Sequence, residues 1–203
     1  MDTRFIDELA SSAPTPGGGG ASAYVGALAA ALASMVGNLT VGKRKYASVE
    51  EDMRERLARL EDVRGRLLDL IEADARAFEP LAASYHMPMD TPEQRAAKHE
   101  ATQTALVAAC DVPLQIIACV QEVVELTDFM VRHGSALALS DAGVAATFAR
   151  AAAEGASMTV FINAAAMDDK AQATVYRSRA NVAITTVRIR CDATFDYVKR
   201  AVS

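Results

Sequence analysis

The chain has 203 residues, of which 51% are hydrophobic, 23% are charged and 5% are aromatic, and it has no Trp. This composition is typical of a globular protein with a sizeable core, and it excludes a disordered chain. The formal net charge of -5 argues against a nucleic-acid-binding protein, which usually carries a basic face. A core rich in Ala, Leu, Val and Met favours closely packed helices over a β-sandwich.

The three cysteines, Cys110, Cys119 and Cys191, form no CxxC pair. Their odd number indicates reduced, buried thiols in a cytoplasmic protein, and not a disulfide framework. The three histidines show no metal-ligand spacing, so we expect no metal and no other cofactor.

The N-terminal sequence MDTRFIDELA is acidic and lacks the apolar run of a signal peptide. Residues 11–42 contain no charged side chain and are long enough to span a membrane. Two prolines, four consecutive glycines and several polar residues dilute that stretch, and its Ala and Gly suit close helix–helix contact. We therefore expect a protein without a membrane partner.

Hydrophobic periodicity predicts about seven helices, over residues 2–10, 21–41, 49–83, 92–133, 141–155, 156–167 and 170–201. Thr91 is the expected N-cap of the fourth helix, with Pro92 in its first position and a kink at Pro113. Ser140 is the expected N-cap of the fifth helix. No alternating strand pattern occurs, so the sequence predicts an all-α bundle that forms one domain over residues 1–203.

A glycine-rich loop, TPGGGG over residues 15–20, directly precedes the second predicted helix. Its backbone N–H groups, at the positive end of a helix dipole, suit an anion or a developing oxyanion, although a flexible linker is an alternative. The loop is not a dinucleotide fingerprint, because Ser22 stands where the third glycine is required. Gly37 to Lys43 fits most of a P-loop, but Arg44 replaces the magnesium-binding hydroxyl and the segment is predicted to be helical.

A basic segment, Lys43, Arg44, Lys45 and Tyr46, is expected to end the second helix. Its cations complement the negative end of a helix dipole, and they also suit a clamp for a carboxylate-bearing ligand. The two interpretations are compatible.

Asp74 is the most informative single residue. It lies in a heptad-spaced apolar line whose other members are Met53, Leu60, Leu67 and Leu81. An ionised carboxylate there is costly unless it is paired or faces a cleft, and desolvation would raise its pKa towards that of a neutral-pH acid–base catalyst. The alternative is a buried acid neutralised by Arg150 or Arg188.

Two further polar residues are weaker candidates. Asp141 follows Ser140 in the first turn of a predicted helix, where the dipole favours an acid in any case. Asn163 lies in the apolar run VFIN and is suited either to a ligand or to a neighbouring helix.

These motifs together resemble the cyclodeaminase/cyclohydrolase family of folate enzymes. The matching runs are LASSAPTPGGGG over residues 9–20, MVGNLTVGKRKY over 35–46, DARAF over 74–78, SDAGVAA over 140–146 and VFIN over 160–163. The resemblance covers essentially the whole chain, in order. It departs after Gly134, where Ser135 stands in place of the Asn that the family usually has.

The resemblance implies an all-α homodimer with a folate-binding cleft near the subunit interface. It implies that Asp74 is the catalytic acid and base, with Asp141 close to the site. The substrate-binding residues that it implies are Thr15, Pro16, Gly17, Gly18, Gly19, Gly20, Lys43, Arg44, Lys45, Tyr46, Ser140 and Asn163.

The expected activity is that of a methenyltetrahydrofolate cyclohydrolase. The first alternative is a formiminotetrahydrofolate cyclodeaminase that releases ammonia. The second is a helical dimer that binds folate or a protein partner without turnover.

Overall fold

The computed structural model describes residues 3–203 and contains, within them, six α-helices, two short 3₁₀ helices and no strand. The elements are α1 (Arg4–Leu9), α2 (Gly18–Asn38), η1 (Arg44–Val49), α3 (Glu50–Tyr85), α4 (Pro92–His133), η2 (Ala136–Ala138), α5 (Leu139–Ala166) and α6 (Lys170–Val202). The predicted all-α bundle is confirmed.

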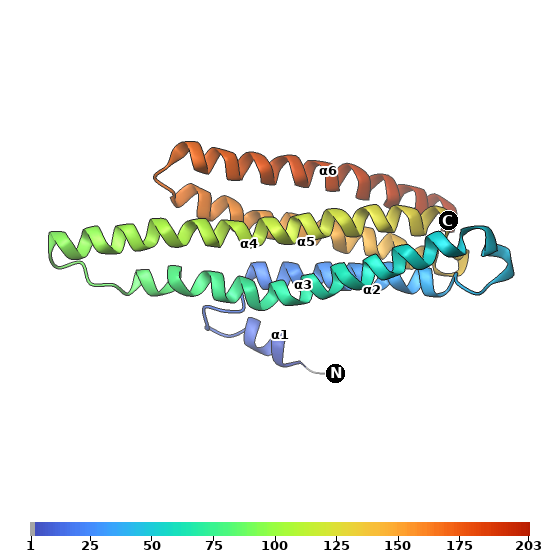
Figure 1. Cartoon of the computed structure of the whole chain (residues 1–203), viewed down its shortest axis with the longest axis horizontal. Helices are drawn as coiled ribbons and strands as arrows, with labels where there is room; N and C mark the ends of the chain where they lie inside the picture. Colours follow the sequence, from blue (N-terminus) through green and yellow to red (C-terminus); the bar gives the residue numbers. More distant parts are fainter. Residues whose placement is uncertain (1–2) are drawn as a thin grey trace.

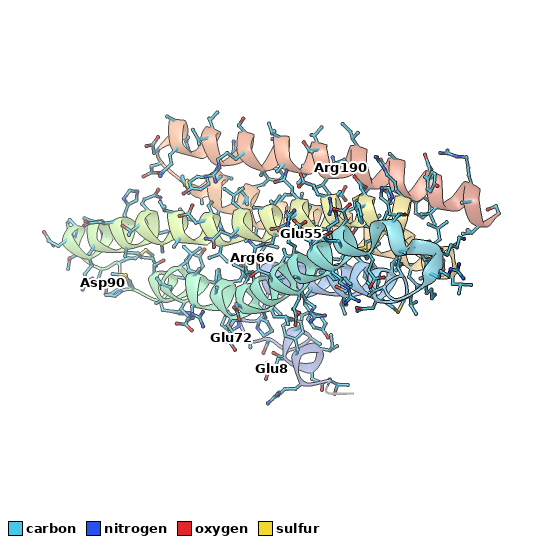
Figure 2. The ribbon with its side chains drawn as sticks, turned by 45° about the vertical axis from the view of Figure 1, so that its right-hand side comes forward. Glu8, Glu55, Arg66, Glu72, Asp90 and Arg190 are labelled. Carbon is cyan, nitrogen blue, oxygen red and sulfur yellow. The ribbon has the colours of Figure 1, made fainter. Side chains whose placement is uncertain are left out.

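The five long helices lie side by side along one axis, and α1 lies outside them (Figure 1). Helix α2 packs against α3, α4 and α5, while α6 covers α4 and α5. Arg190 of α6 reaches towards α4 (Figure 2), where its Nη2 and Nε donate to Oδ2 of Asp128 at 2.6 and 2.9 Å. This charged pair fastens α6 to the bundle.

The core differs between helices in the size of its side chains. In α3 the predicted apolar line is buried, since Met53, Leu60 and Leu67 are fully enclosed. In α2 and α5 the buried faces consist mainly of Ala, Gly and Ser. Small side chains let helix backbones approach closely, and therefore the larger Leu28 and Met35 of α2 lie on its outer side, 39% and 38% exposed.

The prediction of two short helices over residues 141–167 is wrong, because α5 is continuous from Leu139 to Ala166. Gly155, at the expected boundary between the two helices, lies inside α5. A Cβ at that position would be 2.5 Å from the Ser22 hydroxyl of α2, so the glycine serves close packing. Ser140 is also not the N-cap, because η2 precedes the helix and Ala138 has that position.

Other helix ends differ less from the prediction. Helix α2 starts at Gly18 and ends at Asn38, earlier than expected at both ends. Helix α1 starts at Arg4, and Asp2 lies outside the described residues. Thr91 caps α4 as predicted, in a capping box with Gln94, and α4 continues through Pro113.

Two helices, α2 and α4, are long and apolar enough to cross a membrane by length and composition alone. The bundle buries 61% and 56% of their most apolar windows. Core helices of a soluble bundle meet the same criterion, so this finding is weak evidence for a membrane span.

Candidate active site

A pocket of about 220 Å³ lies where the start of α2 meets α3, α4 and α5. Its lining residues are Pro14, Thr15, Gly17, Gly18, Gly19, Asp74, Phe78, Ala109, Thr159 and Asn163. The sequence had indicated the glycine loop, Asp74 and Asn163. It does not single out Pro14, Phe78, Ala109 or Thr159 as site residues, although Pro14 and Phe78 lie within two of the matching runs. Apolar residues and a single Thr in a helix carry no signal of a site.

The Asp74 carboxylate projects from α3 to the first turn of α2. Its Oδ2 accepts a hydrogen bond from the backbone N–H of Gly20 at 2.9 Å. The glycine-rich start of α2 is expected to bind an anion. One of its backbone N–H groups binds the protein's own Asp74 carboxylate.

Asp74 is partly buried and has no ion-pair partner within 4 Å among residues 3–203. Neutralisation by Arg150 or Arg188 is therefore wrong. Both arginines bind Glu154, at 3.0 and 2.6 Å, on the side of the bundle where α5 packs against α6.

Burial raises the pKa of the Asp74 carboxyl above its ordinary value, and the hydrogen bond from Gly20 opposes that rise. Desolvation is the larger effect, so the net direction is upward. A carboxylate of this kind is a better proton acceptor than an exposed one.

Gly19 makes this arrangement possible. A Cβ on Gly19 would lie 2.5 Å from both Cγ and Oδ2 of Asp74, which is closer than real atoms approach. No other residue type fits at position 19 while the carboxylate stays on the helix start.

The opposite wall of the pocket comes from α5. Nδ2 of Asn163 donates to the Ala109 carbonyl of α4 at 2.8 Å, which fixes the direction of the side-chain amide. Thr159 lies one helical turn before Asn163 on the same face and lines the same pocket.

The basic segment lies elsewhere and does not end α2, which stops five residues earlier. Lys43 Nζ donates to the Ser135 hydroxyl at 3.4 Å, and the Tyr46 hydroxyl accepts from the Ala136 backbone N–H at 3.4 Å. This second hydrogen bond is the main cause that lowers the pKa of Tyr46. Ser135 also donates its backbone N–H to Thr40, so the position where the family usually has Asn ties two loops together.

The two groups of candidate residues lie at opposite ends of α2. Its 21 residues span about 30 Å, at 1.5 Å each. Near the start of α2 are the pocket residues Thr15, Gly17, Gly18, Gly19, Asp74 and Asn163. Gly20 lies beside them and donates its N–H to Asp74, and Pro16 faces a neighbouring hollow beneath α1. At the far end are Lys43, Arg44, Lys45, Tyr46, Ser140 and Asp141, which one chain does not bring to the pocket.

No group of three or more His, Cys, Asp or Glu side chains in the described part of the chain could hold a metal ion. The expectation of a metal-free site stays a prediction.

The fold and the pocket define an all-α bundle with a partly buried carboxylate, that of Asp74, in the pocket wall. A sequence model of the formiminotransferase-cyclodeaminase family matches residues 2–182, and the chain belongs to this family.

Three relatives illustrate its range. The methenyltetrahydrofolate cyclohydrolase of Methylorubrum extorquens is 45% identical over 82% of this chain and 80% of its own length. The formimidoyltransferase-cyclodeaminase of Rattus norvegicus is 35% identical over 81% of this chain, which spans only 30% of the rat protein. The solved structure of a formiminotetrahydrofolate cyclodeaminase from Thermotoga maritima has a TM-score of 0.81 and 27% identity, covering 99% of this chain and 95% of that one.

Proposed function

We propose that this protein is a methenyltetrahydrofolate cyclohydrolase, which adds water to 5,10-methenyltetrahydrofolate and forms 10-formyltetrahydrofolate. The observation that carries the proposal is the Asp74 carboxylate, which lines a pocket, has no ion-pair partner within residues 3–203 and has a raised pKa. The 45% identity to the Methylorubrum enzyme supports this reaction. In this proposal the protein is cytoplasmic and uses neither metal nor cofactor, and it has no membrane or nucleic-acid partner.

Asp74 performs two tasks in this reaction. The 5,10-methenyl bridge is a cation, so a carboxylate beside it stabilises the bound substrate and the charge that moves during attack. Asp74 accepts a proton from water as the oxygen bonds to the bridge carbon, and it returns a proton to N5 as the bond between that carbon and N5 breaks. The carbinol hydroxyl loses its own proton to solvent, so one proton is released overall.

The alternative is the cyclodeaminase reaction, in which N10 attacks a 5-formimino group and ammonia leaves. The names of the rat and Thermotoga relatives favour it, but these proteins are less similar to the chain, at 35% and 27% identity. Both reactions use the same bridged carbon and the same proton shuttle.

Parallel assays test the proposal. Purified protein is given methenyltetrahydrofolate, and the loss of its absorbance is followed; in a second cuvette it is given formiminotetrahydrofolate, and ammonia is measured. We expect fast loss of methenyltetrahydrofolate and little release of ammonia from formiminotetrahydrofolate. Ammonia release at the higher kcat/KM would assign the cyclodeaminase, and no turnover of either would leave a folate- or partner-binding protein.

We further infer that the protein is a homodimer through the outer faces of α2 and α5. Both helices pack on α4, so their outer sides face away from it. Those sides carry a row of exposed apolar side chains, which are Tyr24, Leu28, Met35 and Leu39 on α2 and Val144, Met158 and Ile162 on α5. An apolar face of this kind is typical of a subunit interface.

The pocket opens beside this face, because Met158 and Ile162 adjoin the pocket residues Thr159 and Asn163 along α5. We propose a two-fold axis that lies in this interface and crosses the middle of α2 at right angles, which makes the two α2 helices antiparallel. The far end of one chain, with Lys43 and Asp141, then lies near the pocket of the other. In this proposal the cations bind the carboxylates of the folate tail across the interface.

A further inference from the structure

We propose that the Thr159 hydroxyl positions the attacking water in the Asp74 pocket. This inference rests on the proposed hydrolytic function, and it gives a task to a residue outside the matching sequence runs.

Thr159 and Asn163 are four residues apart on α5, so their side chains lie on one face of the helix. Both line the pocket that Asp74 and the start of α2 line from the other side. A polar pair on α5 therefore faces the proposed base across the space available to a ligand.

The Thr159 hydroxyl makes no hydrogen bond to any other part of the chain that the structure describes. Threonine hydroxyls inside helices usually donate to the carbonyl four residues earlier. Thr147 of the same helix does so, to Gly143 at 3.0 Å. Within the described residues, the Thr159 hydroxyl has no hydrogen-bond partner, although its side chain is partly buried. The Thr159 hydroxyl can therefore donate one hydrogen bond to a molecule bound in the pocket and accept others from it.

The neighbouring polar atoms define what such a partner is. Oδ2 of Asp74 holds the Gly20 N–H, which leaves Oδ1 as a free acceptor. Asn163 has one Nδ2 hydrogen engaged with Ala109, which leaves its Oδ1 facing away from that carbonyl. The pocket thus offers oxygen acceptors on two sides and one hydroxyl.

A water molecule fits this set of groups. It donates one hydrogen to Oδ1 of Asp74 and the other to the Thr159 hydroxyl, which leaves an oxygen lone pair for the carbon. The oxygen–carbon bond forms as Asp74 takes the first proton. The second hydrogen of the water stays hydrogen-bonded to the Thr159 hydroxyl and keeps the water oxygen oriented until the oxygen–carbon bond is made. Thr159 is therefore a positioning residue and takes no proton itself.

The test compares Thr159→Val, which keeps the shape of the side chain and removes the hydroxyl, with Thr159→Ser, which keeps the hydroxyl. Thr147→Val is the matched control, because it removes a hydroxyl from the same helix away from the pocket. Steady-state kcat and KM for methenyltetrahydrofolate are measured for all three, together with Tm.

We expect Thr159→Val to lower kcat by about 10- to 100-fold with KM changed less than about twofold, since water is misplaced while folate still binds. We expect Thr159→Ser to keep most of kcat and Thr147→Val to keep all of it. A wild-type kcat in Thr159→Val would overturn the inference, as would a loss that Ser does not rescue or that a fall in Tm accompanies. If the wild-type protein lacks cyclohydrolase activity, the proposed function fails first and this inference fails with it, a result distinct from an active wild type with an active Val variant.

Discussion

Two adjacent glycines at the start of α2 set the position of the Asp74 side chain. Gly19 leaves the space that the Asp74 carboxylate occupies, and the next residue, Gly20, supplies the N–H that holds it. The carboxylate is thereby held at the positive end of α2, and no cation of the described residues forms an ion pair with it. In the proposed function, its negative charge acts on a cationic substrate.

Gly19→Ala tests this arrangement. The new Cβ displaces the carboxylate, so we expect kcat to fall by about 10²-fold, as for other small misplacements of a catalytic group. Gly65→Ala is the control, because Gly65 lies on an exposed part of α3 where a Cβ meets nothing within 4 Å. Equal activity of the two variants would show that the position of Asp74 is not set by Gly19.

The raised pKa of Asp74 predicts the pH dependence of stability. The folded chain holds this proton more tightly than the unfolded chain, so Asp74 reduces stability as pH rises from the ordinary value near 3.8 through its raised value. Asp74→Asn lacks this effect. Urea unfolding of both proteins should therefore show that the free energy of unfolding of the variant rises relative to that of the wild type as pH increases across that window. A difference in free energy that does not change with pH would contradict the raised pKa.

The sequence located part of the site for a physical reason. A carboxylate in an apolar heptad line must be desolvated or paired, and therefore Asp74 was conspicuous. Thr159 was not conspicuous, because Thr is common inside helices and only the three-dimensional pocket shows that its hydroxyl lacks a partner. The Arg150 and Arg188 alternative was wrong because helical spacing does not show which helices face each other.

At the scale of elements, α2 and α5 pack through Ala, Gly and Ser faces. Their presence was predictable from composition and periodicity, but their ends were not. A glycine in a sequence is compatible with a helix end and with close packing, and Gly155 has the second role. The fold class therefore followed from the sequence, whereas the continuity of α5 needed the packing partner.

Ala33→Leu in α2 tests the importance of these small residues. Ala33 is fully buried, so the three added carbon atoms have no space and should destabilise the protein by about 1–3 kcal/mol. Ala96→Leu, on an exposed part of α4, should change stability by less than about 0.5 kcal/mol. Urea denaturation of both variants measures the difference, and equal stability would show that the α2 contact accommodates large side chains.

At the scale of the whole molecule, the length of α2 separates the two groups of candidate residues by about 30 Å. Sequence order and family resemblance placed both groups near one folate, but neither could show whether one chain or two supply them. The apolar faces of α2 and α5 favour two chains.

Mixing two defective variants distinguishes these arrangements. One variant is Asp74→Asn, and the other carries Lys43→Glu and Lys45→Glu. If the site is shared across the interface, half of the randomly mixed dimers contain one intact site, so about a quarter of wild-type activity should return at low substrate concentration. No recovery, with exchange of subunits verified, would show that the two groups do not form one site across the interface.

Turnover of methenyltetrahydrofolate by Asp74→Asn tests whether the Asp74 carboxylate is the catalytic base. The substitution keeps size and hydrogen bonding but removes the base and the negative charge beside the cationic bridge. We expect a folded protein that still binds folate and whose kcat is lower by about 10²- to 10⁴-fold. An Asp74→Asn protein with wild-type kcat would show that the carboxylate has a structural role only and is not the catalytic base.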